Sequence, residues 1–294
     1  MFYRRKILLS LLQVFDGQLE KISLQKLLFL LSENQTVKSY HFVPYKFGCY
    51  SFQANADLHT LEKYGLVKES ENLWEKLDIK DYLEELKPED KASVRFVRNQ
   101  YGALSKDELI ELTYKTYPFF AINSTIAGRI LGEEELETVK KLKPTNTEIV
   151  LYTIGYEGLS LDEYLNKLIL NDVRVLCDVR KNSFSMKYGF SKNQLEKACE
   201  RVGIEYVHIP EVGIDSDKRQ NLNTQADYDT LFAYYRLNVL RNEPEKQKGI
   251  FQLLKNKKRI ALTCFEANIH QCHRKQLAES IAAMDGFAYK IIHI

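Results

Sequence analysis

The residues from Cys264 to Arg274 concentrate side chains that can hold protons, metals or anions. This segment, CFEANIHQCHR, contains two cysteines, two histidines, a glutamate and an arginine. It follows an apolar, β-branched run and leads into an amphipathic helical pattern, which predicts a turn between a strand and a helix. Such a turn suits catalysis or anion binding, because the start of a helix offers unpaired backbone N–H groups.

Three residues of this segment are candidates for catalysis. Glu266 would stand at the mouth of a sheet and act as a general acid or base, with His273 sharing the handling of protons. Cys272 would lie at the start of the helix, where its pKa would fall and its thiolate could act as a nucleophile. Two structural alternatives remain open. Glu266 could pair with Arg274 and only hold the loop, and Cys272 could pack as a small apolar side chain.

A zinc site is a third interpretation of the same segment. It could use both cysteines with His270 or His273, because thiolate and imidazole suit zinc. However, the spacing is not the paired C-x-x-C arrangement of structural zinc sites, and the sequence has no second cluster of cysteine and histidine. We therefore expect neither a metal nor another cofactor here.

The elements that would position these side chains follow residue 148. Near-continuous apolar strands separated by helices indicate an open, mostly parallel, Rossmann-like sheet covered on both faces. Ser160 with Glu163 predicts a capping box, and Gly203 predicts a helix end. The five expected strands are EIVLYTIG, VRVLCDV, IEYVHI, RIALTC and AYKIIHI, and the expected helices are SLDEYLNKLIL, SKNQLEKACERVG, ADYDTLFAYYRLNVL and QCHRKQLAESIAAM.

Polar residues follow several of the expected strands. In open α/β sheets ligands bind outside the carboxyl ends of the strands, so these residues would share one edge if the sheet is parallel. Arg180 and Arg274 could hold a phosphate or carboxylate. Gly155 would let the backbone approach the ligand, and Tyr156 would orient it or stack on it. The alternative for Arg180 is a salt bridge with Asp178.

A polar stretch at residues 140–149, KKLKPTNTEI, separates two styles of sequence. Before it, helical periodicity dominates, with Ser23 as an expected helix cap and Gly65 as an expected helix end. LVKESENLWEKL then resembles two short strands around a turn. Helices followed by a small hairpin predict a winged-helix-like recognition domain at residues 1–143, before an α/β domain at residues 148–294.

Composition narrows the class of protein. The 294 residues are 45% hydrophobic and 28% charged, as in ordinary soluble globular proteins. The net charge of +2 is too small to imply nucleic-acid binding without local clustering. Five cysteines form no disulfide framework, and the apolar runs fall well short of the roughly 20 residues of a membrane helix. We expect a cytoplasmic protein that does not enter a membrane.

Two family resemblances accompany these patterns. From Val150 to Ile294, the motifs YTIGYEG, CDVRKNS and CFEANIHQCHR occur in the order found in the family called domain of unknown function 488. The N-terminal segments ISLQKLLFLLSE and YHFVPYKFGCYS resemble the SocA-like helical domain, also called Panacea, which implies a DNA- or protein-binding module. The first resemblance supplies no reaction, but it implies a single site made of Gly155, Tyr156, Asp178, Arg180, Glu266, Cys272, His273 and Arg274.

These patterns lead to two expectations of function. The first is a nucleotide- or nucleic-acid-related anion-binding protein that acts as a hydrolase or transferase at a nucleotide, with a role such as genome defence. The second is a non-enzymatic, ligand-sensing regulator or antitoxin-like protein. In both, the partner is a nucleotide or another phosphorylated ligand, and DNA could bind through the N-terminal domain. Changing Glu266 to Gln separates the two, since only an enzyme would lose turnover while it still binds the ligand.

Overall fold

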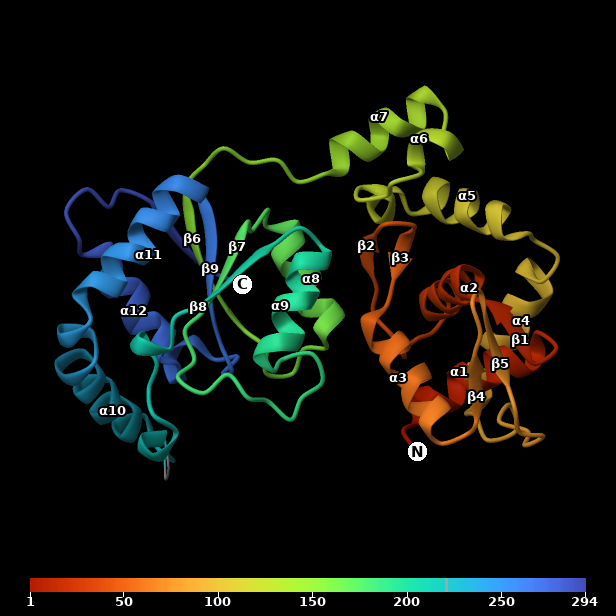
Figure 1. Ribbon diagram of the computed structural model, residues 1–294, viewed down its shortest axis with the longest axis horizontal. Helices are drawn as coiled ribbons and strands as arrows, with labels where there is room; N and C mark the ends of the chain where they lie inside the picture. Colours follow the sequence, from red (N-terminus) through yellow and green to blue (C-terminus); the bar gives the residue numbers. More distant parts are fainter. Residues whose placement is uncertain (220–221) are drawn as a thin grey trace. The chain divides into compact units, whose positions relative to one another are not determined.

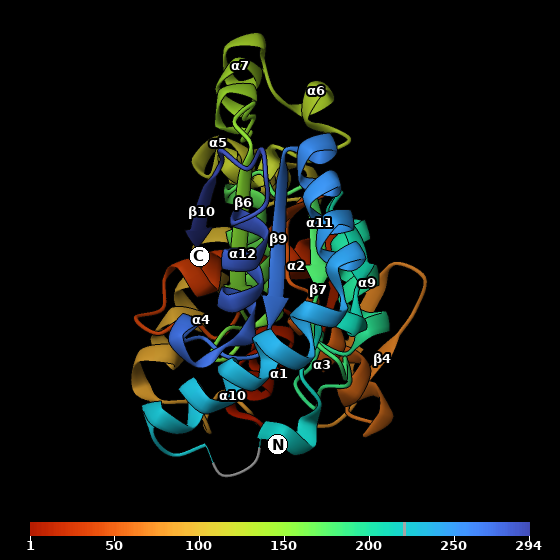
Figure 2. The ribbon, with the colours of Figure 1, turned by 90° about the vertical axis from the view of Figure 1, so that its left-hand side faces the viewer.

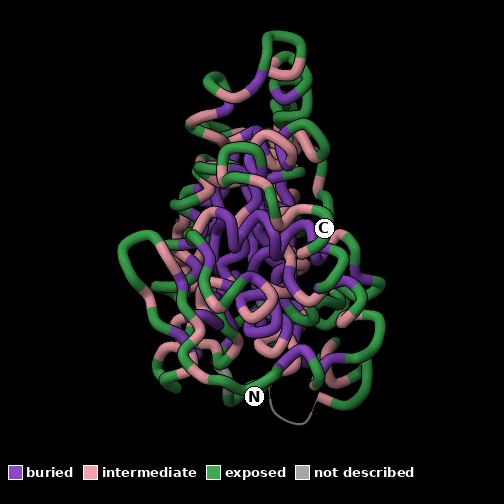
Figure 3. Tube along the Cα trace, turned by 90° about the vertical axis from the view of Figure 1, so that its right-hand side faces the viewer, coloured by how far each residue is buried: buried purple, intermediate pink, exposed green. Residues whose placement is uncertain are grey.

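The computed structural model describes residues 1–219 and 222–294. The chain divides into two compact units, Met1–Lys143 and Pro144–Ile294 (Figure 1). Among the residues described, no helix is both long and apolar enough to cross a bilayer. Each unit has its own buried core. In Figure 3 the chain trace alternates between buried segments and exposed loops.

The C-terminal unit is built on a five-stranded sheet in the order β10-β6-β9-β7-β8. All four neighbouring pairs are parallel, which confirms the predicted sheet. Every residue of the three inner strands is buried, as expected for strands covered on both faces. The strands are β6 (Val150–Gly155), β7 (Val175–Asp178), β8 (Glu205–His208), β9 (Arg259–Cys264) and β10 (Lys290–His293).

Helices cover both faces of this sheet. In Figure 1, α8 and α9 lie on one face and α10, α11 and α12 on the other. Figure 2 shows β10, β6, β9 and β7 in that order across the sheet, with α11 and α12 against one face. The helices are α8 (Leu161–Leu170), α9 (Lys192–Arg201), α10 (Gln225–Asn238), α11 (Pro244–Lys257) and α12 (His273–Ala282), and the short 3-10 turns are η2 (Pro210–Val212), η3 (Ser216–Arg219), η4 (Leu240–Asn242) and η5 (Ile269–Gln271).

Local signals explain several of these boundaries. The Ser160 hydroxyl accepts a hydrogen bond from the Glu163 N–H and completes the predicted capping box of α8. Gly203 follows α9 with a φ of +80°, a left-handed conformation that glycine adopts without strain. Helix α11 is not among the helices expected from the sequence. Its signal was Pro244 in the first turn, where the missing N–H of proline costs no hydrogen bond.

The N-terminal unit has the order of elements of a winged helix. Helices and a short strand come first, and a hairpin then completes an antiparallel sheet in the order β1-β5-β4. A second hairpin, β2–β3, is inserted before α3. The elements are α1 (Tyr3–Val14), β1 (Gln18–Glu20), α2 (Lys21–Glu33), β2 (Val43–Tyr45), β3 (Gly48–Tyr50), α3 (Phe52–Lys63), β4 (Val67–Glu69), β5 (Leu73–Lys76), α4 (Pro88–Tyr101), α5 (Lys106–Thr116), η1 (Pro118–Ala121), α6 (Ala127–Ile130) and α7 (Glu133–Leu142).

One predicted cap in this unit is wrong and one helix end is confirmed. Helix α2 begins at Lys21, directly after β1, so its N-cap is Glu20 and Ser23 lies buried within the first turn. Strand β1 runs into helix α2 without a loop, so Ser23 is already inside the helix and cannot be its N-cap. Gly65 follows α3 with a φ of +69° and ends that helix as expected.

Candidate functional site

The carboxyl edge of the sheet gathers the polar residues that follow the inner strands. Strand β9 lies between β6 and β7, so Cys264 pairs with Gly155, and Thr263 pairs with Asp178. Because these strands are parallel, the segments that leave them begin side by side. Figure 1 shows the ends of β6, β7 and β9 together at one edge.

Asp178 and Arg180 form a buried ion pair at this edge. The Arg180 Nε donates to the Asp178 carboxylate at 2.8 Å, and Nη2 donates to the second carboxylate oxygen. Its Nη1 donates to the Tyr156 hydroxyl and to the Phe190 carbonyl, both at 2.8 Å. The Tyr206 hydroxyl donates to Asp178 at 2.6 Å. The guanidinium is therefore used within the protein, in line with the salt-bridge alternative for Arg180.

Tyr156 forms part of the wall behind this pair. Its ring stacks on Phe190 with centroids 4.3 Å apart and planes 10° apart, and only 3% of the residue is exposed. Its face is therefore covered, which leaves little room for the predicted stacking on a ligand. Two other aromatic residues are open to solvent: Phe184 is 73% exposed and Phe265 is 43% exposed.

Gly155 and Arg274 together hold the loop that follows β9. A Cβ on Gly155 would lie 1.9 Å from the carbonyl oxygen of Glu266, so only glycine fits there. Arg274 donates to that same carbonyl at 2.5 Å and to the Ala267 carbonyl at 3.2 Å. The alternative of a Glu266–Arg274 ion pair is thereby corrected: Arg274 binds the loop backbone, and the Glu266 carboxylate has another partner.

That partner is Arg219, which is not among the site residues predicted from the sequence. Its Nη1 pairs with Glu266 Oε1, and the second oxygen, Oε2, is buried with no hydrogen-bond partner in the part of the chain that the structure describes. Burial and the nearby charge of Cys264 raise the pKa of Glu266. Arg219 ends the short turn η3, which follows β8 at a distance, so no motif or strand-end position marks it.

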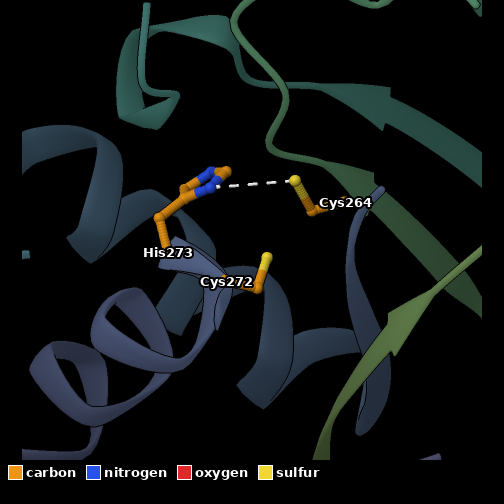
Figure 4. Close-up of side chains that lie close together, drawn as sticks. All are labelled: Cys264, Cys272 and His273. Atoms are coloured by element: carbon orange, nitrogen blue, oxygen red, sulfur yellow. Dashed lines mark hydrogen bonds between the residues drawn. The ribbon is translucent and has the colours of Figure 1, made fainter. Parts of the chain in front are cut away.

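Cys264, Cys272 and His273 form a buried cluster (Figure 4). Their sulfur and ring nitrogen atoms all lie within 4.8 Å of one another. The Val179 carbonyl lies 3.1 Å from His273 Nε2, and a carbonyl can only accept, so Nε2 carries the proton. Nδ1 then presents a lone pair, which lies 2.6 Å from Arg219 Nη2 and 3.7 Å from Cys264 Sγ.

The two thiols differ in acidity. Burial opposes ionisation of Cys264, but a hydrogen bond from Cys272 and the charge of Arg219 outweigh it and hold the pKa of Cys264 well below its usual range. Burial and the charge of Cys264 raise the pKa of Cys272 well above its usual range. This corrects the expectation that the helix start would lower the pKa of Cys272.

Two cavities open next to this cluster, with volumes of about 460 Å³ and about 370 Å³. Both are lined by Ile214, Arg219, Phe265 and Glu266, so they adjoin. The larger cavity also reaches His273. The remaining side chains of the smaller cavity are mainly polar or aromatic, and they are Tyr156, Arg180, Lys181, Asn182, Phe184, Ser185 and Cys264.

The residues predicted from the sequence therefore meet at one edge in two groups. Asp178, Arg180 and Tyr156 are joined by hydrogen bonds, and Arg274 and Gly155 both lie against the Glu266 carbonyl. His273 links the groups, because its Nε2 reaches the backbone between Asp178 and Arg180. The binding of a ligand by these residues stays a prediction.

The C-terminal half of the chain resembles a known family. The family model called Domain of unknown function DUF488 matches residues 160–281, which run from the cap of α8 into α12 and include the cluster of Cys264, Cys272 and His273. This confirms the resemblance for the C-terminal half, where the matched residues include the motifs CDVRKNS and CFEANIHQCHR. No curated protein matches the chain. The likeness of the N-terminal segments to the SocA-like domain stays a prediction.

Proposed function

We propose that the C-terminal unit is a hydrolase or transferase that binds an anionic, nucleotide-like ligand at the carboxyl edge of its sheet. The observation that carries this proposal is the position of Glu266, which lines both cavities and is held there by Arg219. One carboxylate oxygen is engaged and the other is not, so the side chain is oriented and still able to accept a proton. These are the requirements for a general base next to a ligand.

The residues that line the smaller cavity support a nucleotide-like ligand in this proposal. The exposed rings of Phe184 and Phe265 offer faces on which a planar base can stack. Arg219 and Lys181 line the same cavity and supply positive charge for a phosphate. Arg180 borders the cavity too, but its donors hold Asp178 and Tyr156, so in this proposal it keeps the wall in shape.

For the N-terminal unit we propose recognition of a protein rather than of DNA. In a winged helix the helix before the hairpin is the one that enters a groove of DNA. Here that helix is α3, and Lys63 is its only lysine or arginine. Contacts with phosphate dominate the affinity of proteins for DNA, so a helix with so little positive charge suits a protein surface better.

The test is to separate binding from turnover in the whole 294-residue chain. Binding of a panel of nucleotides and phosphorylated sugars is measured by calorimetry, and products are followed by chromatography. We expect Glu266→Gln to keep the dissociation constant within a few-fold and to lower turnover by about 10²–10⁴-fold, the usual contribution of a general acid or base. Glu211→Gln is the matched control, because Glu211 pairs with Lys246 at the surface.

Each outcome decides between functions. Binding without turnover in the unaltered protein would contradict an enzyme and favour the sensing regulator. Turnover that survives in Glu266→Gln would remove Glu266 from the mechanism. If the unaltered protein binds no member of the panel, the proposal of a nucleotide-like ligand fails.

A further inference from the structure

We infer that Cys264, Cys272 and His273 are the three protein ligands of a divalent metal ion of the zinc class. Two sulfur atoms and one imidazole nitrogen lie within 4.8 Å of one another in a buried cluster. They come from the end of β9, the N-cap of α12 and the first residue of that helix. Sequence spacing argued against zinc, but the strand end and helix start bring together ligands that lack the C-x-x-C pattern.

The geometry fits tetrahedral coordination. With bonds of about 2.3 Å to sulfur and about 2.1 Å to nitrogen, the sulfur–nitrogen edge of a tetrahedron is about 3.6 Å. The distance between Cys264 Sγ and His273 Nδ1 is 3.7 Å. Nδ1 is the ring nitrogen without a proton, because Nε2 donates to the Val179 carbonyl. Histidines that bind metals are usually oriented by such a bond from the second ring nitrogen.

A positive charge already stands among these donors. The Nη2 of Arg219 lies 2.6 Å from His273 Nδ1 and 3.7 Å from Cys264 Sγ. Nδ1 has one lone pair, so Arg219 and a metal ion compete for it. Arg219 is carried by the short turn η3, and its side chain is 25% exposed, so it can leave the cluster without unfolding a strand or a long helix.

Three protein ligands with an open fourth position are the arrangement of catalytic zinc sites, whereas structural sites are closed by four. A metal of this kind activates a bound water molecule, and a neighbouring glutamate that is not a ligand then handles the proton. Glu266 shares Arg219 with His273 and is therefore adjacent to the cluster. This role in hydrolysis rests on the proposed function, whereas binding of the metal does not.

The test is a titration of the reduced 294-residue chain with Co²⁺, which replaces zinc and gives absorption bands when thiolates bind it. We expect one equivalent of Co²⁺ to develop these bands and Zn²⁺ to remove them. Protons leave the protein as the metal binds, because Cys264 and Cys272 bind as thiolates and His273 contributes only its lone pair. A pH indicator in weak buffer measures that release.

Variants test whether Co²⁺ binds at this cluster or elsewhere in the protein. Cys264→Ser and Cys272→Ser should each abolish the bands, while Cys199→Ser, a change at a buried cysteine of α9, should keep them. Arg219→Gln should tighten the binding of Co²⁺ by about tenfold or more, because the competing cation is gone. Near-UV circular dichroism shows that each variant is folded.

The inference is overturned if the folded, reduced protein takes up no Co²⁺, if both serine variants keep the bands, or if Arg219→Gln weakens binding. These results are distinct from failure of the proposed function. A protein that binds Co²⁺ but neither binds nor converts a nucleotide keeps its metal site and loses the function. A protein that converts a nucleotide but binds no metal keeps the proposed function and loses the metal site.

Discussion

The carbonyl oxygen of Glu266 lies 1.9 Å from the point where a Cβ on Gly155 would stand. The end of β6 and the loop after β9 are thus in direct backbone contact. Arg274 donates a hydrogen bond to the same Glu266 carbonyl. The position of the Glu266 side chain depends on this contact. It is a consequence of strand order, since β6 and β9 are neighbours in the sheet.

The first prediction concerns Gly155. In Gly155→Ala the new methyl group must push the loop away, and overpacking of this kind costs about 1–3 kcal/mol. We expect a loss of that size in the free energy of unfolding, measured by chemical denaturation. Gly249→Ala is the control, because Gly249 lies exposed in α11 with open space around it. That change should stabilise the protein by up to about 1 kcal/mol, and equal effects of the two changes would contradict the packing argument.

The second prediction concerns the buried ion pair. Asp178→Asn leaves the Arg180 charge buried without its partner, and breaking such a pair costs about 3–5 kcal/mol. We expect a large drop in the midpoint of denaturation. Glu205→Gln, which removes the exposed pair with Lys257, should cost at most about 1 kcal/mol. A small effect of Asp178→Asn would mean that Tyr206 and the surrounding dipoles, and not the ion pair, stabilise this edge.

The third prediction concerns Arg274, which binds the backbone of the loop after β9. Arg274→Lys keeps the charge but cannot form both bonds to the carbonyls of Glu266 and Ala267. We expect faster hydrogen exchange at the backbone amide of Ala267, which donates to Glu157 at 2.9 Å. Exchange in α8 should not change. Lys275→Arg, one residue further along, is the control, and loop exchange as slow as in the unaltered protein would show that Arg274 is not needed to hold the loop.

The fourth prediction is a dependence on pH. Tyr164 is fully buried, its hydroxyl donates to Thr263 at 2.7 Å, and burial raises the pKa of Tyr164 well above its usual value. The unfolded chain therefore loses this proton near pH 10 while the folded protein keeps it, so stability falls as pH rises above about 10.

Tyr164→Phe removes this contribution. At neutral pH it should cost about 1 kcal/mol for the lost hydrogen bond. Above pH 10 the unaltered protein should lose about 1.4 kcal/mol per pH unit more than the variant, so the difference between them shrinks. Denaturation at pH 7 and at two values above 10 measures this change, and a difference that does not depend on pH would refute it.

Much of the fold could be predicted because its signals are local. Several features depend only on neighbouring residues. They are the apolar runs of the three inner strands, the capping box of Ser160 with Glu163, and the helix ends at Gly65 and Gly203. Ser23 failed as a cap because pairing of β1 with β5 brought the start of α2 earlier. That pairing joins segments far apart in the chain.

The candidate site divides in the same way. Local sequence patterns were enough to predict which residues follow strand ends, and therefore that Asp178, Arg180 and Glu266 would meet at one edge if the strands ran parallel. The partners of these residues depend on how the chain folds. Arg180 turned inward to Asp178, and Arg219 reached Glu266 from a segment with no local signal. Partner choice and acidity depend on strand order and on burial, and both arise from contacts between residues distant in sequence.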